Sequence, residues 1–166
     1  MNLEEQLLTE LFDRPYRWQT RNMGGRDVAA AAREAGNATY TFKTDEGDTV
    51  MVEFNEDLDD ERDVFIAEFR RQGSYSVTGG GDAPRIFATV IDIMQHFVQE
   101  VHPDILTFSA DTDVKNDGAT GETMVIRSRI KLYDRMVQRF ARRLGYQYSS
   151  RPDPYSGTSQ EYYIWK

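Results

Sequence analysis

The chain has 166 residues, a net charge of −8 and no cysteine. Its length suits one domain with its own core, and its hydrophobic content of 39% excludes a disordered chain. The lack of cysteine excludes a disulfide framework, a thiolate zinc site and a cysteine nucleophile. The acidic balance disfavours nucleic-acid binding over the whole surface. No long apolar run or apolar leader is present, which predicts a soluble, cytoplasmic protein.

The first 36 residues have the pattern of two helices. Residues 2–12 place four leucines on one helical face, namely Leu3, Leu7, Leu8 and Leu11. Asp27 then precedes an alanine-rich run that Gly36 closes, which predicts a short helix with an N-cap and a C-cap. We expect Tyr16 and Trp18, between the two helices, to cover the core.

Between Thr39 and Phe69 the hydrophobic period changes from the helical value to about 2, which is typical of strands. A turn at residues 45–48 predicts a β-hairpin, and an acidic loop separates it from the next strand. The economical arrangement is an antiparallel meander. Its expected strands are residues 40–42, 50–54, 64–70 and 75–78.

Three consecutive glycines, residues 79–81, join the expected fourth strand to a long helix that reaches Val101. The apolar residues of this helix cover much of its circumference, which predicts burial on more than one side. A short buried strand is expected at residues 105–108. Strand, turn, helix and strand in this order predict a right-handed crossover between two parallel strands.

The last third of the chain begins with a polar loop at residues 111–123. Ser128 can cap a second main helix, which extends to Leu144 and is followed by a glycine stop. Two closing strands are expected at residues 146–148 and 161–165.

These elements predict an α/β (α+β) fold in a single domain over residues 1–166. Residues 1–36 form its N-terminal helical segment, and residues 38–166 hold the sheet and the two main helices. The sheet is expected to be mixed and mostly antiparallel, with one β-α-β crossover.

The glycine turn is the first candidate binding site. Free backbone N–H groups at the start of a helix can hold an anion, and Arg85 adds a positive charge. The residues of such a site would be Gly79, Gly80, Gly81, Asp82, Ala83 and Arg85. The favoured alternative is a structural turn in which Asp82 caps the helix and competes with the anion. The spacing is neither that of a Rossmann nor that of a Walker motif.

A strongly uneven charge distribution gives the second candidate. Residues 43–63, the acidic strip, contain ten acidic and two basic residues, whereas residues 127–151 contain eight basic residues and one acid. The positive residues of the second predicted helix, here called the basic stripe, are Arg127, Lys131, Arg135, Arg139, Arg142 and Arg143. Such a stripe suits an acidic protein partner, a nucleic-acid backbone or the phosphates of a cofactor. The alternative is a solvated face that balances the acidic strip.

Metal and triad patterns are weak. Residues 111–118 resemble a calcium loop, but Lys115 and Met124 occupy positions that require oxygen ligands, so no metal is expected. The two histidines, His96 and His102, lack the G-x-S-x-G elbow that would support a hydrolase triad.

The order of elements resembles the Gcn5-related N-acetyltransferase (GNAT) fold. In that family the turn after the fourth strand carries Gln/Arg-x-x-Gly-x-Gly/Ala and holds the pyrophosphate of coenzyme A. Gly79 and Gly81 match this motif, and Ser76 stands at the Gln/Arg position. The resemblance implies acetyl-CoA as the cofactor.

The same family places a general-acid tyrosine shortly before a Gly-Phe/Tyr pair. Gly145 and Tyr146 match that pair, but Phe140 stands near the tyrosine position. Tyr133, which lies earlier, is the catalytic residue that the resemblance suggests.

Residues 75–148 resemble more closely a group of uncharacterised tailed-phage proteins. The shared segments are Thr78–Ala83, Phe87–Val90, Phe108–Ala110 and Ser128–Arg135. This resemblance implies a phage origin, and a location in the host-cell cytoplasm or in the virion.

We therefore expect a phage-encoded accessory or binding protein rather than an enzyme, with a protein partner, no cofactor and no membrane contact. Nucleic acid would bind only through the basic helix. An acyl-CoA-dependent N-acetyltransferase is the alternative function, and a virion structural component is a third.

Overall fold

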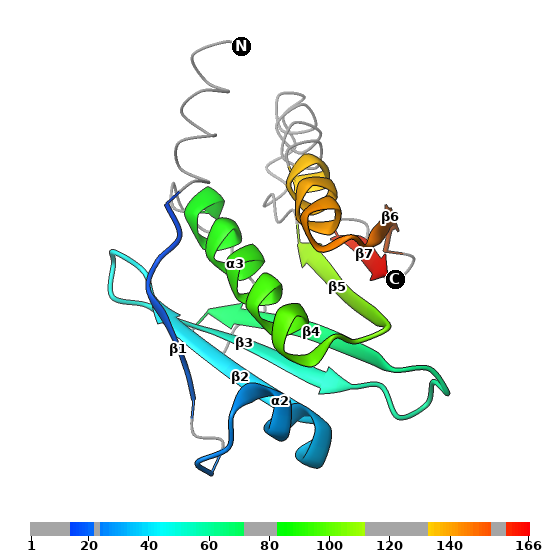
Figure 1. Ribbon diagram of the computed structural model, residues 1–166. Helices are drawn as coiled ribbons and strands as arrows, with labels where there is room; N and C mark the ends of the chain where they lie inside the picture. The colour runs from blue at the N-terminus through cyan, green and yellow to red at the C-terminus, as the bar shows by residue number, and fades with distance from the viewer. Residues whose placement is uncertain (1–13, 22–23, 72–82, 112–132, 154–158) are drawn as a thin grey trace.

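The computed structural model describes residues 14–21, 24–71, 83–111, 133–153 and 159–166. These form an open sheet with two long helices on one of its faces (Figure 1). The strands are β1 (Trp18–Thr20), β2 (Asn37–Lys43), β3 (Thr49–Glu56), β4 (Val64–Arg71), β5 (Ile105–Asp111), β6 (Gln147–Pro152) and β7 (Ser159–Trp165). The helices are α2 (Val28–Ala30), its π-helical continuation η1 (Ala31–Ala35), α3 (Ala83–Val101) and a helix over residues 133–144, here called the C-terminal helix.

The strand order is β1-β2-β3-β4-β5-β7-β6. Every neighbouring pair is antiparallel except β4 and β5, which are parallel. Since α3 connects β4 to β5, the predicted mixed, mostly antiparallel sheet with one crossover is confirmed.

The first strand of the crossover differs from the prediction. We expected residues 75–78 to fill that place, but β4, at Val64–Arg71, is the strand that pairs in parallel with β5. β4 also pairs with β3 on its other side, so both of its edges form hydrogen bonds to neighbouring strands. Residues 75–78 lie outside the described ranges, as does the predicted helix at residues 2–12.

β4 and β5 are paired over only part of their length. The parallel register runs from Val64 with Ile105 to Ala67 with Phe108. Both strands continue beyond it, through residues 68–71 and 109–111, without pairing with each other. Figure 1 shows the two strands separating toward their C-terminal ends.

The short helix between β1 and β2 has the predicted caps. The side chain of Asp27 accepts a hydrogen bond from the Ala30 N–H at 2.7 Å, which satisfies a free donor of the first turn. Gly36 ends the segment in the left-handed conformation, with a φ of 73°. Between the caps the helix widens into the π-helical turn η1, which the sequence pattern did not predict.

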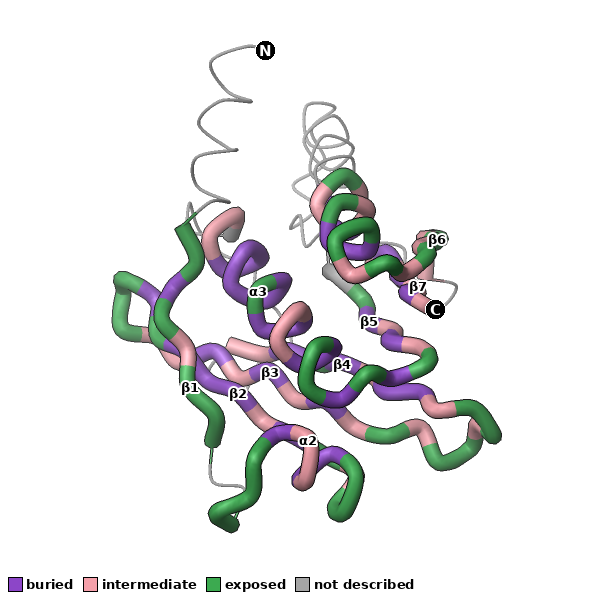
Figure 2. The backbone as a smooth tube through the Cα atoms, viewed as in Figure 1, coloured by how far each residue is buried: buried purple, intermediate pink, exposed green. Residues whose placement is uncertain are grey.

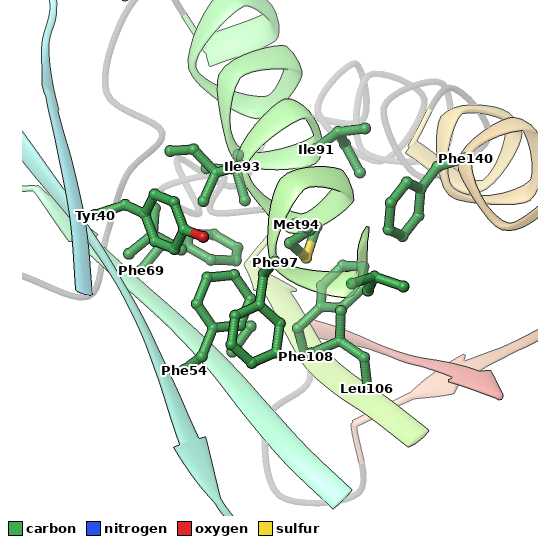
Figure 3. Close-up of a cluster of buried hydrophobic side chains, with 14 of the residues drawn as sticks. Tyr40, Phe54, Phe69, Ile91, Ile93, Met94, Phe97, Leu106, Phe108 and Phe140 are labelled. Carbon is green, nitrogen blue, oxygen red and sulfur yellow. The ribbon is translucent and has the colours of Figure 1, made fainter. Parts of the chain in front are cut away.

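The core lies between the sheet and the two long helices. Figure 2 shows buried residues along α3 and along the strands that it covers. Phe97 of α3 is fully buried, stacks on Phe54 with a centroid distance of 4.0 Å, and meets Phe65 edge-on at 5.2 Å. Figure 3 shows Ile91, on the other side of α3, near Phe140 of the C-terminal helix. The helix α3 is therefore buried on two sides, as predicted.

Other predicted boundaries are close to the observed ones. α3 ends before His102, which has a positive φ of 52°, and the C-terminal helix ends before Gly145, which has a φ of 73°. β6 and β7 begin within two residues of their predicted starts, although β6 is longer than predicted. β1 was not predicted as a strand.

Candidate functional site

The C-terminal helix has one buried and one charged side. Tyr133, Val137 and Phe140 recur every three or four residues and are buried in the core. This spacing turns the intervening positions outward. The exposed positions include four arginines of the basic stripe, namely Arg135, Arg139, Arg142 and Arg143. Figure 2 shows exposed residues recurring along this helix. The other two members of the stripe, Arg127 and Lys131, lie outside the described residues.

These four arginines form no ion pair with any residue that the structure describes. Ion pairs of arginine do occur elsewhere in the described ranges, where they use Arg26, Arg33, Arg62, Arg70, Arg71, Arg85 and Arg151. The four side chains of the stripe therefore place a block of positive charge in solvent, without a neutralising carboxylate from the described part of the fold.

The acidic strip is neutralised from a different source. Its carboxylates pair with arginines of β4, α3, η1 and the strip itself: Asp45 with Arg85, Glu46 and Asp48 with Arg71, Glu53 with Arg70, Asp60 with Arg62, and Asp63 with Arg33. The distances run from 2.6 Å, for Glu53 with Arg70, to 3.2 Å, for Glu46 with Arg71. The alternative interpretation was that the basic stripe is a solvated face that balances the acidic strip. Among the described residues, no ion pair joins the stripe to the strip.

Most of the predicted anion site lies outside the described residues, since only Ala83 and Arg85 fall within them. Arg85 donates to the carbonyl oxygen of Arg14 at 2.8 Å and to Asp45 at 3.0 Å. Its guanidinium also lies over the ring of Tyr16, 3.9 Å from the centroid. An anion at the glycine turn would have to compete with these partners for Arg85.

Tyr133, the tyrosine suggested by the GNAT resemblance, lies in the core. Its side chain is 3% exposed, and its ring stacks on Phe87 of α3 with a centroid distance of 4.1 Å. This contact connects the N-terminal part of α3 to the C-terminal helix. A role as general acid would require a substrate that reaches this buried ring.

A second buried tyrosine lies beneath the C-terminal helix. The hydroxyl of Tyr162 and Oδ1 of Asp134 are both buried, and neither has a hydrogen-bond partner among the described residues. Burial first, and then the charge of Asp134, raise the pKa of Tyr162. The ring of Tyr162 stacks on Phe108 at 5.0 Å.

The sequence pattern did not reveal a polar cluster that joins β1 and β2 to α3. The Tyr40 hydroxyl is 2.8 Å from Nδ1 of His96, and the Trp18 indole donates to Asp92 at 2.8 Å. His96 Nε2 lies 3.9 Å from Glu100. Burial and, less strongly, the charge of Glu100 raise the pKa of Tyr40. The spacing of four between the polar residues of α3 was the only signal of this cluster in the sequence. Since Trp18 also contacts the rings of Tyr40 and His96, the cluster fixes the edge strand to the helix.

The described ranges contain neither a cluster of metal ligands nor a membrane-spanning helix. No three potential metal ligands gather there closely enough to hold an ion. No helix within those ranges is long and apolar enough to cross a membrane.

Comparison with known proteins gives no family assignment. No protein-family model matches the chain, and no curated protein matches its sequence.

Proposed function

We propose that this protein is a phage-encoded accessory protein that binds an acidic protein partner through the basic stripe, on an acetyltransferase-like scaffold. The observation that carries the proposal is the exposure of four arginines on one helix without an ion pair to any described residue. Arginine holds carboxylates in a planar, bidentate geometry and is therefore well suited to such a partner. For a phage-encoded accessory protein we expect the host-cell cytoplasm as the location, with the virion as the alternative.

A protein partner is favoured over a nucleic acid because of the charge of the whole molecule. The net charge of −8 repels a polyanion at long range. A folded acidic protein can present a few carboxylates to the stripe without bringing a continuous row of phosphates past the acidic strip. Nucleic-acid binding through the helix is thus an outcome to test rather than the expected one.

The test is a binding titration with a fluorescent polyglutamate peptide, followed by anisotropy. We expect the variant with Arg135, Arg139 and Arg142 changed to Glu to bind at least about tenfold more weakly, because each exposed charge pair contributes up to about 1 kcal/mol. The matched control changes Arg17, Arg21 and Lys43 to Glu. These residues are also exposed, and the change in net charge is the same.

Unchanged affinity in the stripe variant, or equal losses in both variants, would remove the stripe from the proposal. A duplex DNA of equal charge serves as the competing probe. Tighter binding of the DNA than of the peptide would favour nucleic acid as the partner. Once the stripe is established, a pull-down from host lysate with the same variants can identify the natural partner.

An acyl-CoA-dependent N-acetyltransferase is a second candidate, supported by the separation of β4 and β5 beyond Ala67 and Phe108. The unpaired edges there offer backbone groups to an extended ligand that contains amides. Residues 79–83 would hold its pyrophosphate. Thermal denaturation with acetyl-CoA tests this directly, since a ligand at 100 times its dissociation constant adds about 2.7 kcal/mol of stability. No shift at millimolar acetyl-CoA would exclude it. A virion structural role, the third possibility, predicts a fixed copy number in purified particles.

A further inference from the structure

The loop between β3 and β4, residues 57–63, forms a second charged surface. Three of its carboxylates, those of Asp57, Asp59 and Glu61, form no ion pair with any described residue, and Asp59 and Glu61 are exposed. These charges belong to the part of the acidic strip that no described arginine neutralises. The protein therefore presents an acidic surface of the kind that its own basic stripe is proposed to bind.

Hydrogen bonds and an ion pair restrain this loop at both of its ends. The Asp57 N–H donates to the carbonyl oxygen of Val64 at 2.9 Å, and the Asp59 N–H donates to the side chain of Asp57 at 3.1 Å. At the end of the loop, the guanidinium of Arg33 donates two bonds of 2.7 Å to the two carboxylate oxygens of Asp63. A loop ordered in this way loses little conformational entropy when it binds.

An exposed apolar side chain stands between the loop carboxylates. Leu58 is 84% exposed, and it is the one large hydrophobic residue of the described ranges that is exposed. On the C-terminal helix, Met136 is only partly buried and stands one, three and seven positions from Arg135, Arg139 and Arg143. On a helix the spacing of three brings Met136 beside Arg139, while Arg143 lies on the same side of the helix but two turns from Met136. Both surfaces thus combine an accessible apolar group with charges, and the charges have opposite signs.

We propose that the β3–β4 loop of one copy docks on the basic stripe of a second copy and forms a salt-sensitive homodimer. Asp59 and Glu61 face the arginines, and Leu58 packs beside Met136. In this proposed dimer the contact is made twice, loop to stripe in each direction, so that the pair closes with two-fold symmetry. This inference rests on the proposed function, because it uses the same stripe and names a second copy as one acidic surface that fits it.

Salt should act on the dimer in a defined direction. At about 0.1 M salt the Debye length is roughly 10 Å, so the repulsion between two acidic molecules is largely screened while contacts at ion-pair distance persist. At about 1 M salt the Debye length is roughly 3 Å, and the interfacial pairs are weakened as well. Self-association should therefore be measurable at the lower salt concentration and decrease at the higher one.

Sedimentation equilibrium at several protein concentrations tests this. We expect the average mass of the wild type to rise from 19.2 kDa toward twice that value at the lower salt concentration. The stripe variant (Arg135, Arg139 and Arg142 to Glu) and a loop variant (Asp59→Lys with Glu61→Lys) should each stay monomeric. Their equimolar mixture should associate again, because each copy then faces the opposite charge. Such recovery also shows that both variants are folded.

A wild type that is monomeric at all concentrations overturns the dimer, and so does a mixture that stays monomeric while both variants melt cooperatively. The control variant at Arg17, Arg21 and Lys43 should associate like the wild type. Polyglutamate binding separates the two claims. If the stripe binds the peptide but the protein does not self-associate, the dimer is wrong and the proposed function stands. If the peptide does not bind either, both are wrong.

Discussion

Two tyrosines are placed where ionisation would put a negative charge into the core. Tyr40 and Tyr162 are both fully buried, and burial is the largest cause of the raised pKa of each. Their hydroxyls have different surroundings. That of Tyr40 contacts His96, whereas that of Tyr162 has no hydrogen-bond partner among the described residues.

The raised pKa of these tyrosines predicts a loss of stability in alkali. In the unfolded chain a tyrosine ionises near pH 10, whereas in the folded protein it stays neutral to a higher pH. The contribution of these two tyrosines to stability is therefore fully present below about pH 10. Above it, the free energy of unfolding should fall by about 1.4 kcal/mol per pH unit for each tyrosine. Urea titrations between neutral pH and the alkaline range measure this slope.

The variant Tyr162→Phe should retain the fold at neutral pH and reduce the alkaline slope by about one tyrosine's share. Tyr40→Phe should do the same but lose the contact with His96, which costs about 1 kcal/mol at neutral pH. An unchanged alkaline slope in Tyr162→Phe would show that this hydroxyl ionises equally in the folded and unfolded states.

At the scale of elements, the sequence predicted what depends on local signals. The cap residues Asp27 and Gly36 gave the bounds of the short helix, and the apolar periodicity gave α3 and its burial on two sides. β1 was missed because it has three residues and owes its position to pairing with β2 and to the contact of Trp18 with Asp92. Such long-range contacts have no counterpart in a local pattern.

The candidate site also has features that local sequence signals predict and features that depend on long-range contacts. The basic stripe could be predicted, because helical periodicity alone places its arginines on one side. The lack of ion pairs between the stripe and the described residues could not be predicted, because the arginines that pair with the acidic strip are distant from it in sequence. Asp45 meets Arg85 forty positions away, and Asp63 meets Arg33 thirty positions away. Only the fold decides which charges neutralise one another.

Phe97 provides a test of how the core holds α3 on the sheet. It is fully buried between Phe54 and Phe65, and an alanine there would leave a cavity bounded by two rings. We expect Phe97→Ala to lower the free energy of unfolding by about 3–5 kcal/mol, and Phe97→Leu to cost less because it fills part of the space. Denaturant titration measures both values.

Leu58→Ala is the matched control for this prediction, since Leu58 is large, apolar and 84% exposed. Its removal should change the stability of the monomer by no more than about 0.5 kcal/mol. A Phe97→Ala variant as stable as Leu58→Ala would mean that α3 does not depend on this aromatic contact.

At the scale of the whole molecule, the distribution of charge lowers the stability of the monomer. Five arginines neutralise much of the acidic strip within the fold, while four others stand together on the C-terminal helix without a partner among the described residues. Like charges four positions apart on a helix repel, by about 0.2–0.5 kcal/mol for each pair. If the stripe exists for binding, removing one of its charges should stabilise the monomer and weaken the interaction.

Arg139 is the position that tests this, because it stands four residues after Arg135, three before Arg142 and four before Arg143. Arg139→Gln removes all three repulsive pairs and keeps a good helix former. We expect it to raise the free energy of unfolding by roughly 0.5 kcal/mol at low salt, and the gain to vanish at high salt because these arginines are exposed. Arg17→Gln, which lies outside the helices, should change nothing under either condition. The measurement is urea denaturation of dilute protein, at concentrations where it is monomeric. A loss of stability at low salt would mean that Arg139 is already neutralised within the monomer, and the stripe would then not be a vacant surface for an acidic partner.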